Sequence, residues 1–219
     1  MVLVSACGHE AAPPSKAETG TPSPNVALDH RGMWISGHAY QELLDVRSIH
    51  METSDLTPGS TFRASADLTR DGRCSATLLV DGKSARLIRI GNVGYVTGVG
   101  AAPEVPPEIA SGQKWVRVPA RGALWKNCSL RWLTSAVKAL AEDVVFNAGH
   151  KRLDGVPVEE ATDDPDTARI FVSLQRPWHT MRIEIDKLKT RIDLSRYNRP
   201  VRIVAPPASD MYVAHGAGV

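Results

Sequence analysis

The sequence has little of several features that would point directly to a function. It contains 219 residues, of which only three are cysteine and 5% are aromatic. No segment approaches the roughly 20 consecutive apolar residues that a transmembrane helix needs. There are 26 Lys and Arg residues against 24 Asp and Glu residues, and the formal net charge is therefore +2. This balance argues against a nucleic-acid-binding protein, which normally carries a strong positive field.

Catalytic and metal-binding motifs are also missing. The sequence has no Gly-x-Ser-x-Gly elbow, no His-Glu-x-x-His pair and no Gly-x-x-x-x-Gly-Lys loop. The seven histidines are scattered singly and there is no Cys-x-x-Cys, so a zinc site has little support. An acidic loop at Thr162–Asp166 could hold a cation weakly, although a solvated turn is the simpler interpretation. We therefore predict that the protein is not an enzyme and has no cofactor and no metal.

The stretch from Asp71 to Gly98 carries the clearest structural signal. It contains two Asp-Gly steps, at residues 71–72 and 81–82, and a Gly-Asn step at residues 91–92. Glycine tolerates a positive φ, and Asp and Asn hydrogen-bond to the backbone that follows them, so each dipeptide suits a tight reversal. The runs between the steps are long enough for one strand each. This pattern predicts an antiparallel meander.

Several segments alternate between apolar and polar residues, as strands with one buried face do. In residues 61–68 the side chains of Ala64 and Ala66 share one face, and Ala76 and Leu78 share one face of the next strand. The Pro-rich segment 101–110 is predicted to be a loop, because three prolines cannot serve a central strand. The other predicted strands are residues 46–51, 83–90, 93–97, 114–119, 144–146, 156–160, 168–174, 179–186, 190–195 and 201–204.

Charged residues alternate with apolar ones in the strand that contains Met181, Ile183 and Ile185. The charged set is Arg182, Glu184 and Asp186, next to Arg191 and Asp193 on the following strand. We predict a solvated outer face with cross-strand pairs, each worth only tenths of a kcal/mol. A ligand-binding charge cluster is the alternative.

Two helices are predicted. Residues 129–142 place Leu130, Leu133, Val137 and Leu140 on one side, which makes this the most amphipathic segment of the chain. Its apolar side needs an apolar partner, and the predicted sheet is the only candidate. A second, short helix is predicted at His38–Asp45.

The N-terminal residues Val4-Ser5-Ala6-Cys7 look like a bacterial lipobox, in which the Cys7 thiol receives a diacylglycerol. Two acyl chains would give stable membrane anchoring. A chance cysteine after small residues is the alternative. No Lys or Arg precedes Cys7 and the apolar run is short, so either the true start lies upstream or the signal does not function. Residues 9–25 are rich in Pro, Ala, Ser, Thr and Gly, which predicts a disordered tether.

If Cys7 is lipidated, Cys74 and Cys128 can pair, as suits an exported and oxidising setting. Such a bridge would join the start of a strand to the entrance of the predicted helix 129–142. Closing a loop of this length is worth roughly 4 kcal/mol in the chain-entropy model.

The succession of these pieces resembles the LppX/LprG-type lipoproteins of actinobacteria, which belong to the LolA-like superfamily. The resemblance rests on the lipobox, the tether, residues 71–77 (Asp-Gly-Arg-Cys-Ser-Ala-Thr), and residues 88–96, 112–119, 154–158 and 197–208. It covers nearly all of the chain after about residue 38. One departure is the Pro-rich segment 101–110, where the family usually carries a longer aromatic helix.

The resemblance implies an α+β fold, a curved antiparallel half-barrel with helices on its concave side and an apolar cavity for lipid acyl chains. It also implies a strand and the following helix bridged by the cysteine pair. The expected organisation is a signal remnant (1–7), a disordered tether (8–29), one domain (30–213) and a flexible tail (214–219).

We therefore expect an extracytoplasmic lipoprotein, anchored to the cell membrane, that binds a lipid or another amphipathic molecule. No nucleic-acid partner is expected, and the sequence leaves the oligomeric state open. The alternative is an envelope module that carries no ligand and docks onto a membrane or cell-wall partner, through the aromatic residues Trp125, Trp178 and Tyr197 near loops. The predicted cavity residues are Ala64, Ala66, Ala76, Leu78, Leu133, Val137 and Leu140.

Overall fold

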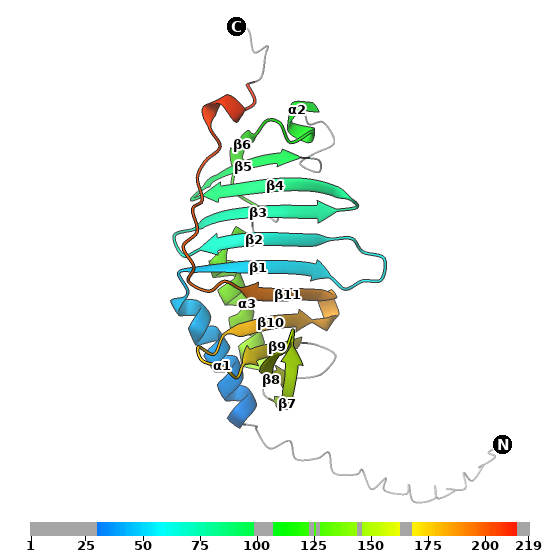
Figure 1. Cartoon of the computed structure of the whole chain (residues 1–219), viewed down its shortest axis with the longest axis vertical. Helices are drawn as coiled ribbons and strands as arrows, with labels where there is room; N and C mark the ends of the chain where they lie inside the picture. Colours follow the sequence, from blue (N-terminus) through cyan, green and yellow to red (C-terminus); the bar gives the residue numbers. More distant parts are fainter. Residues whose placement is uncertain are drawn as a thin grey trace, which may run out of the picture.

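The computed structural model describes residues 30–98, 107–122, 125, 128–143, 146–162 and 168–213. These residues form one antiparallel sheet of eleven strands in the order β6-β5-β4-β3-β2-β1-β11-β10-β9-β8-β7. The sheet is open, with β6 and β7 as its two edges (Figure 1). The predicted segments 1–7, 8–29 and 214–219 lie outside the described residues.

The elements have the following bounds. The strands are β1 (Ser48–Asp55), β2 (Arg63–Thr69), β3 (Arg73–Val80), β4 (Lys83–Ile90), β5 (Val93–Gly98), β6 (Val116–Pro119), β7 (Phe146–Leu153), β8 (Val156–Thr162), β9 (Ala168–Ser173), β10 (Thr180–Ile185) and β11 (Thr190–Ser195). The helices are α1 (His30–Asp45), α2 (Pro107–Ala110) and α3 (Leu130–Asp143), with short 3-10 turns at Asp186–Leu188 and Ala208–Asp210.

The predicted meander from Asp71 to Gly98 is confirmed. Each Asp-Gly or Gly-Asn step reverses the chain between neighbouring strands, and β2 to β6 pair in sequence order. At the two-residue reversal between β3 and β4, Asp81 and Gly82 both adopt positive φ, at 50° and 73°. This is the pair of left-handed residues that a two-residue hairpin turn needs.

One long-range pairing joins the two halves of the chain. β1 pairs with β2 on one side and with β11 on the other, and Met51 lies opposite both Ala66 and Leu194. The strands β7 to β11 form a second run of sequence neighbours. The sheet is therefore two meanders that share β1 as their central partner.

The hydrophobic core lies on the face of the sheet that the helices cover. Side chains at alternate positions of each strand point to this face, and the register aligns them in rows across the strands. One such row is Val116, Val96, Leu87, Ala76, Ala66, Met51 and Leu194, and all seven belong to the core or pack against it.

The two long helices cover this face near the β7–β11 end of the sheet, whereas α2 lies by β5 (Figure 1). Helix α1 contacts α3 and also β7, β8 and β9. It begins at His30 and not near His38 as predicted. The sequence before His38 includes Gly32 and Gly37, which have low helix propensity, and the burial of Ile35 and Ser36 supplies the stabilisation that the local sequence lacks.

Two strand predictions were wrong. Residues 201–204 form no strand; they run as an irregular segment flanked by Pro200 and Pro206, and the Ile203 carbonyl accepts a hydrogen bond from Arg73 instead of a ladder partner. Strand β7 extends to Leu153, well past the predicted end at residue 146. As an edge strand it needs no continuous apolar pattern, so its polar sequence gave no period-2 signal.

A disulfide joins Cys74 at the start of β3 to Cys128 just before α3, with Cα atoms 5.3 Å apart. Both cysteines are buried within the core. Arg89, which lies opposite Cys74 on β4, donates to the Cys128 carbonyl at 3.4 Å. The bridge therefore fixes the chain that leads into α3 against the middle of the sheet.

Trp125 fills the concave face over β5. A Cβ atom placed on Gly94 would lie 2.3 Å from Trp125 Cζ2, far inside van der Waals contact. The indole is 4% exposed, so it has little room to move. Glycine is required at position 94 because the ring lies directly on the strand backbone.

We expect Gly94→Ala to lower the free energy of unfolding by about 1–3 kcal/mol, because the added methyl overpacks the Trp125 contact. The matched control is Gly37→Ala on α1, where an added Cβ meets no atom within 4 Å. That variant should gain about 0.5–1 kcal/mol from helix propensity. Urea unfolding followed by circular dichroism measures both, and equal effects of the two substitutions would contradict the packing described here.

Removal of the disulfide in the double variant Cys74→Ala/Cys128→Ala should lower the free energy of unfolding by about 4 kcal/mol, the chain-entropy value for the loop that it closes. Reduction of the wild-type protein should cause a similar loss, and reductant should not affect the variant. Chemical denaturation with and without dithiothreitol measures these differences. A loss below about 1 kcal/mol would mean that the core alone holds α3 in place.

Candidate functional site

A groove between α1 and α3 has a volume of about 330 Å³. This volume is at the lower end of the roughly 300–1,000 Å³ typical of small-molecule sites. We call it the α1–α3 groove. Its lining residues are Tyr40, Leu43, Leu44, Arg70, Leu130, Arg131, Thr134, Ser135 and Lys138.

The floor of the α1–α3 groove is apolar. Leu43 and Leu130 are buried and belong to the core, and Tyr40 packs against the core from the side. The spacing of Leu130, Thr134 and Lys138 on α3, and of Tyr40 and Leu44 on α1, is the i, i+4 spacing that keeps side chains on one helix face. Two helix faces therefore meet at the groove, with Leu43 and Leu130 at its base.

The rim of the groove is basic. Arg70, Arg131 and Lys138 line it, all three are exposed, and none of the lining residues is acidic. Lys138 pairs with Glu142 one turn further along α3 at 3.7 Å, and both side chains are more than half exposed, so this pair is weak. The hydroxyls of Thr134 and Ser135 lie beside these cations. An apolar floor below three cations suits a molecule with an apolar body and an anionic head.

The predicted cavity residues all lie on the concave side of the fold. Leu133 and Val137 of α3 are fully buried and pack with Ala66 and Ala76 in the core, and Leu78 and Leu140 pack against that cluster. Ala64 is also buried. None of these residues lines the α1–α3 groove. The α3 residues that line the groove are offset from Leu133 and Val137 around the helix. The groove therefore opens beside the predicted set, above the packed core.

A second hollow, of about 650 Å³, lies on the other side of α1, against the loop between β9 and β10. We call it the α1–β10 hollow. It is larger than the groove, and its lining carries charges of both signs. Its lining residues are His38, Gln41, Glu42, Asp45, Val46, Arg176, Pro177, Trp178, His179 and Asn198.

A polar contact at the base of this hollow joins α1 to β10. The Glu42 carboxylate pairs with His179 and accepts the backbone N–H of Thr180 at 3.0 Å. The His179 ring stacks on Tyr197, whose hydroxyl donates to the Thr180 carbonyl at 2.5 Å. Burial raises the pKa of Tyr197 well above its ordinary value, and the negative charge of Glu42 adds to this, while the hydrogen bond to Thr180 opposes it. This arrangement holds a neutral phenol in place and has no nucleophile, so it is a structural contact.

The three aromatic residues proposed as docking anchors have different surroundings. Trp125 is buried against Gly94, and Tyr197 is occupied in the contact with His179 and Thr180. Only Trp178 lies at a hollow. Sequence reasoning placed all three near loops; in the structure Trp125 belongs to the core, and Trp178 and Tyr197 pack against it.

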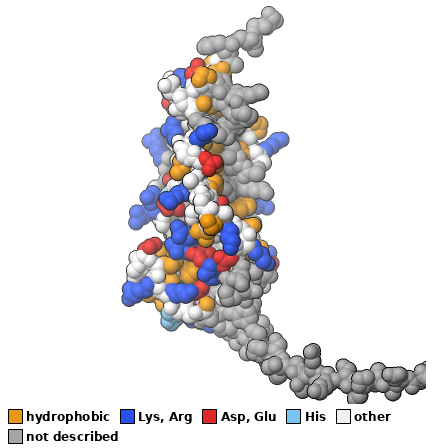
Figure 2. Space-filling view, turned by 90° about the vertical axis from the view of Figure 1, so that its right-hand side faces the viewer, with side chains coloured by type: hydrophobic (Ala, Val, Ile, Leu, Met, Phe, Trp, Pro, Cys, Tyr) orange, Lys and Arg blue, Asp and Glu red, His pale blue; other side chains and the backbone are white. Residues whose placement is uncertain are grey.

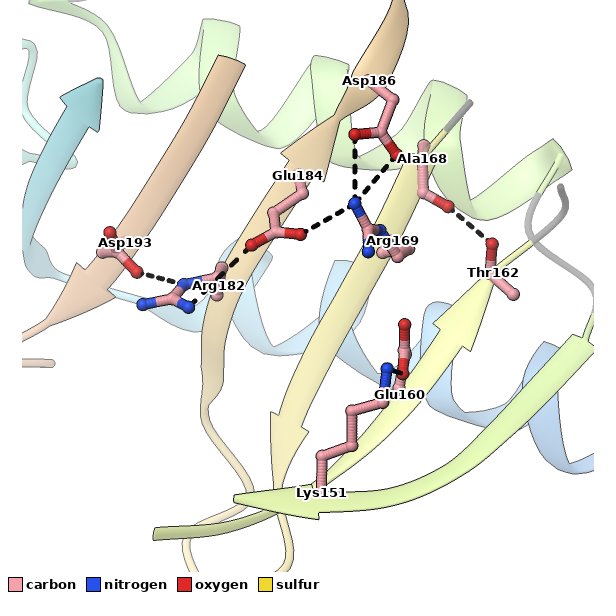
Figure 3. A network of polar contacts seen from close by, with 9 residues as sticks. All are labelled: Lys151, Glu160, Thr162, Ala168, Arg169, Arg182, Glu184, Asp186 and Asp193. Carbon is pink, nitrogen blue, oxygen red and sulfur yellow. Dashed lines mark hydrogen bonds and ion pairs between the residues drawn. The ribbon is translucent and has the colours of Figure 1, made fainter. Parts of the chain in front are cut away.

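Charged side chains form a network on the face of the sheet turned away from α1 and α3, as Figure 3 shows. Arg182 of β10 donates to Asp193 of β11 at 2.5 Å, and Arg169 of β9 reaches Glu184 at 3.1 Å and Asp186 at 2.9 Å. Further along the sheet, Lys151 pairs with Glu160. Figure 2 shows acidic side chains gathered among basic ones in the lower half of its view.

This network is less solvated than the sequence predicted. The Arg182 and Glu184 side chains are 17% and 14% exposed, and that of Glu160 is only 3% exposed. Alternating charged residues on a strand predict a solvated face. The pattern cannot show how closely these side chains pack above a curved sheet, and this explains the difference. Each of these carboxylates faces a cation, so the network consists mainly of ion pairs between its own members. The buried Nε of Arg169 has no hydrogen-bond partner within the described residues.

Within the described residues, no group of three or more His, Cys, Asp or Glu side chains is placed to hold a metal ion. The acidic residues at 163–166 lie outside the described part. Among the helices of the described residues, none is both long and apolar enough to cross a membrane.

No protein-family model matches this sequence, and a comparison with curated proteins found no match. Solved structures do match. LprF from Mycobacterium bovis is similar with a TM-score of 0.57 and 17% identity, over 80% of this chain and 97% of LprF. The lipoprotein LppX from Mycobacterium tuberculosis is similar with a TM-score of 0.51 and 15% identity, over 80% of this chain and 98% of LppX. At this identity the likeness establishes the fold alone, and it confirms the predicted LppX-type architecture.

We expect Arg182→Ala to lower the free energy of unfolding by about 1 kcal/mol, because it removes the cation that Asp193 and Glu184 share and leaves each with one other cation, Arg191 and Arg169. The matched control is Lys138→Ala, which removes the exposed pair with Glu142 and should cost less than about 0.5 kcal/mol. Thermal and urea unfolding measure both variants. Equal, small losses would support the solvated outer face that the sequence predicted.

Proposed function

We propose that the protein is an extracytoplasmic lipoprotein, anchored through Cys7, that binds a lipid or another amphipathic molecule at the α1–α3 groove. The observation that carries this proposal is the groove itself, with buried Leu43 and Leu130 below Arg70, Arg131 and Lys138. An apolar site with a few convergent polar groups is the usual form of a small-molecule site. The fold shared with the lipoprotein LppX is consistent with this function.

The groove would hold the ligand at the junction between its polar and apolar parts. The cations of the rim suit a phosphate or carboxylate, which guanidinium groups bind in a forked geometry. Below them, the floor leads toward Leu133, Val137 and Leu140 of α3, the predicted cavity residues. We propose that longer acyl chains reach these residues when α1 moves away from α3.

The contacts of α1 are compatible with such a movement. It packs on α3, and two of its polar contacts to the sheet, Arg31–Glu159 and Glu42–His179, involve no residue of the groove lining. If α1 moves while these two contacts are kept, the groove widens. The Cys74–Cys128 bridge fixes the start of α3 and would not be affected.

The direct experiment is native mass spectrometry of the full-length protein, extracted from the membrane of an actinobacterial host in mild detergent. A lipid-sized adduct should accompany the folded protein, and an anionic headgroup should be found in the released lipid. Absence of any such adduct under all extraction conditions would contradict the proposal.

The site is tested by Ser135→Trp, because Ser135 is exposed, lines the groove and makes no contact with the core. An indole at this position fills the groove, and we expect the affinity for a fluorescent fatty acid to fall about tenfold or more. The matched control is Ala139→Trp, one turn further along α3, exposed and outside the groove lining. It should bind like wild type. Equal binding by both variants would place the ligand elsewhere.

A further inference from the structure

The outward face of α1 is apolar. Met33, Trp34 and Leu44 are 46%, 42% and 40% exposed, and they account for three of the eight exposed large hydrophobic side chains among the described residues. Gly37 and Gln41 lie between them on the same side of the helix, since residues three and four apart share a face. We call this surface the α1 stripe.

The charged groups of α1 lie at the borders and ends of the stripe. Arg31 binds Glu159 through two hydrogen bonds, at 2.7 and 2.5 Å, and Glu42 is turned to His179 and Thr180. Asp45 is the last residue of the helix. A helix on the surface of a protein normally presents charged residues to water. This one presents methionine, tryptophan and leucine instead.

Basic and aromatic side chains are stacked together at the N-terminal half of the stripe. The Trp34 and His38 rings lie parallel with centroids 5.2 Å apart, and Trp178 meets both of them edge-on at 5.3 Å. The Arg31 guanidinium lies 4.8 Å from the centre of the Trp34 ring, and the Arg176 guanidinium lies 4.8 Å from the centre of the Trp178 ring. Tryptophan beside arginine is the combination typical of the interfacial zone of a bilayer.

Further cations flank the stripe on both sides. The α1–α3 groove on one side brings Arg70, Arg131 and Lys138, and the α1–β10 hollow on the other side brings Arg176. On the hollow side Glu42 and Asp45 accompany Arg176, so the basic border of the stripe is the groove side. An exposed apolar ridge beside a basic border complements an anionic lipid surface, where each Lys or Arg adds about 1 kcal/mol of attraction.

We infer that the α1 stripe rests in the headgroup region of an anionic bilayer, with Trp34, Met33 and Leu44 inserted. The chain outside the described structure supports this choice of partner, because the segment that carries Cys7 joins the domain at His30, one turn before Met33 and Trp34. An anchor at Cys7 therefore brings this end of α1 to the membrane first. The inference rests on the anchoring part of the proposed function, because a lipid at Cys7 would keep this face close to a bilayer.

The consequence is a route for the ligand. Leu44 belongs both to the stripe and to the lining of the α1–α3 groove. When the stripe lies on the membrane, the mouth of the groove opens at the headgroups, and an amphipathic ligand passes between bilayer and groove with its apolar part shielded from water.

The experiment uses the full-length chain with Cys7→Ala, which removes the lipid and leaves the stripe as the membrane contact. Flotation with vesicles of phosphatidylglycerol and phosphatidylcholine measures the partition coefficient. The double substitution Met33→Ser/Trp34→Ser should lower it about tenfold or more, because it removes the two inserted side chains. The matched control, Leu188→Ser/Val204→Ser, removes side chains that are 68% and 52% exposed elsewhere and should bind within about twofold of the parent.

Two further measurements keep the inference falsifiable if the double variant is unstable. Arg176→Gln should weaken binding to phosphatidylglycerol vesicles about fivefold and leave binding to neutral vesicles unchanged. In the acylated wild-type protein, brominated lipids should quench tryptophan fluorescence. Trp34→Phe should remove most of this quenching, whereas Trp132→Phe should keep it.

Vesicle binding that is equal in the stripe and control variants overturns the inference, and so does tryptophan quenching that survives Trp34→Phe. Loss of binding to a purified membrane protein or to cell-wall glycan in the stripe variant, with vesicle binding unchanged, would also overturn it in favour of that partner. These outcomes are distinct from failure of the proposed function, because Ser135→Trp and native mass spectrometry test the ligand without any vesicle.

Discussion

The structure depends on one requirement, which is that a wide open sheet must have its apolar face covered. Eleven strands present alternate side chains to a single side, and the rows that run from Val116 to Leu194 make that side continuous. Burial of this face is the main source of stability, since each large apolar side chain contributes about 1.5–3 kcal/mol when it is removed from water. Helices α1 and α3 and the segment around Trp125 cover this face, and they differ in how firmly they are held to it.

The segments that cover the apolar face are held firmly over one end of the sheet and less firmly over the other. Over β3 to β6, Trp125 lies directly on Gly94, and the disulfide ties residue 128 to the sheet. Over the other end, α1 packs on α3 and on the strands, and among the described residues it is joined to the sheet by the polar contacts Arg31–Glu159 and Glu42–His179. A groove remains where the two helices meet. A covalently fixed helix beside one held by packing is a suitable arrangement for a site that must open to admit an apolar chain.

Much of the fold was predictable from the sequence, because the signals were local. The Asp-Gly and Gly-Asn steps marked the reversals, and the alternation in residues 61–68 and 74–80 gave the inner face of β2 and β3 correctly. The full length of α1 was missed because Gly32 and Gly37 weaken the local signal, and β7 was missed because an edge strand needs no apolar period. The groove could not be predicted at all. It arises from the side-by-side packing of two helices far apart in sequence, and Arg70 joins them from the end of β2.

The outer charge network and the α1 stripe were also beyond sequence reasoning, for opposite reasons. Charges on alternate positions of a strand suggest water, yet Glu160 and Glu184 are largely buried among their partners. Apolar residues on a helix suggest a core, yet Met33 and Trp34 face outward. For the strands the period was read correctly and the environment of the face was not, because the environment depends on which neighbours the complete sheet brings to it. For α1 the predicted helix began near His38, so Met33 and Trp34 lay outside it.

The central claim is that an amphipathic ligand occupies the space between α1 and α3. Photo-crosslinking tests it most directly, with the full-length protein in membranes that contain a phospholipid bearing a diazirine on its acyl chain, followed by peptide mapping. The account predicts adducts on peptides that contain residues 40–44 and 130–138. Adducts confined to the outer face of the sheet, or none on these two helices, would contradict it.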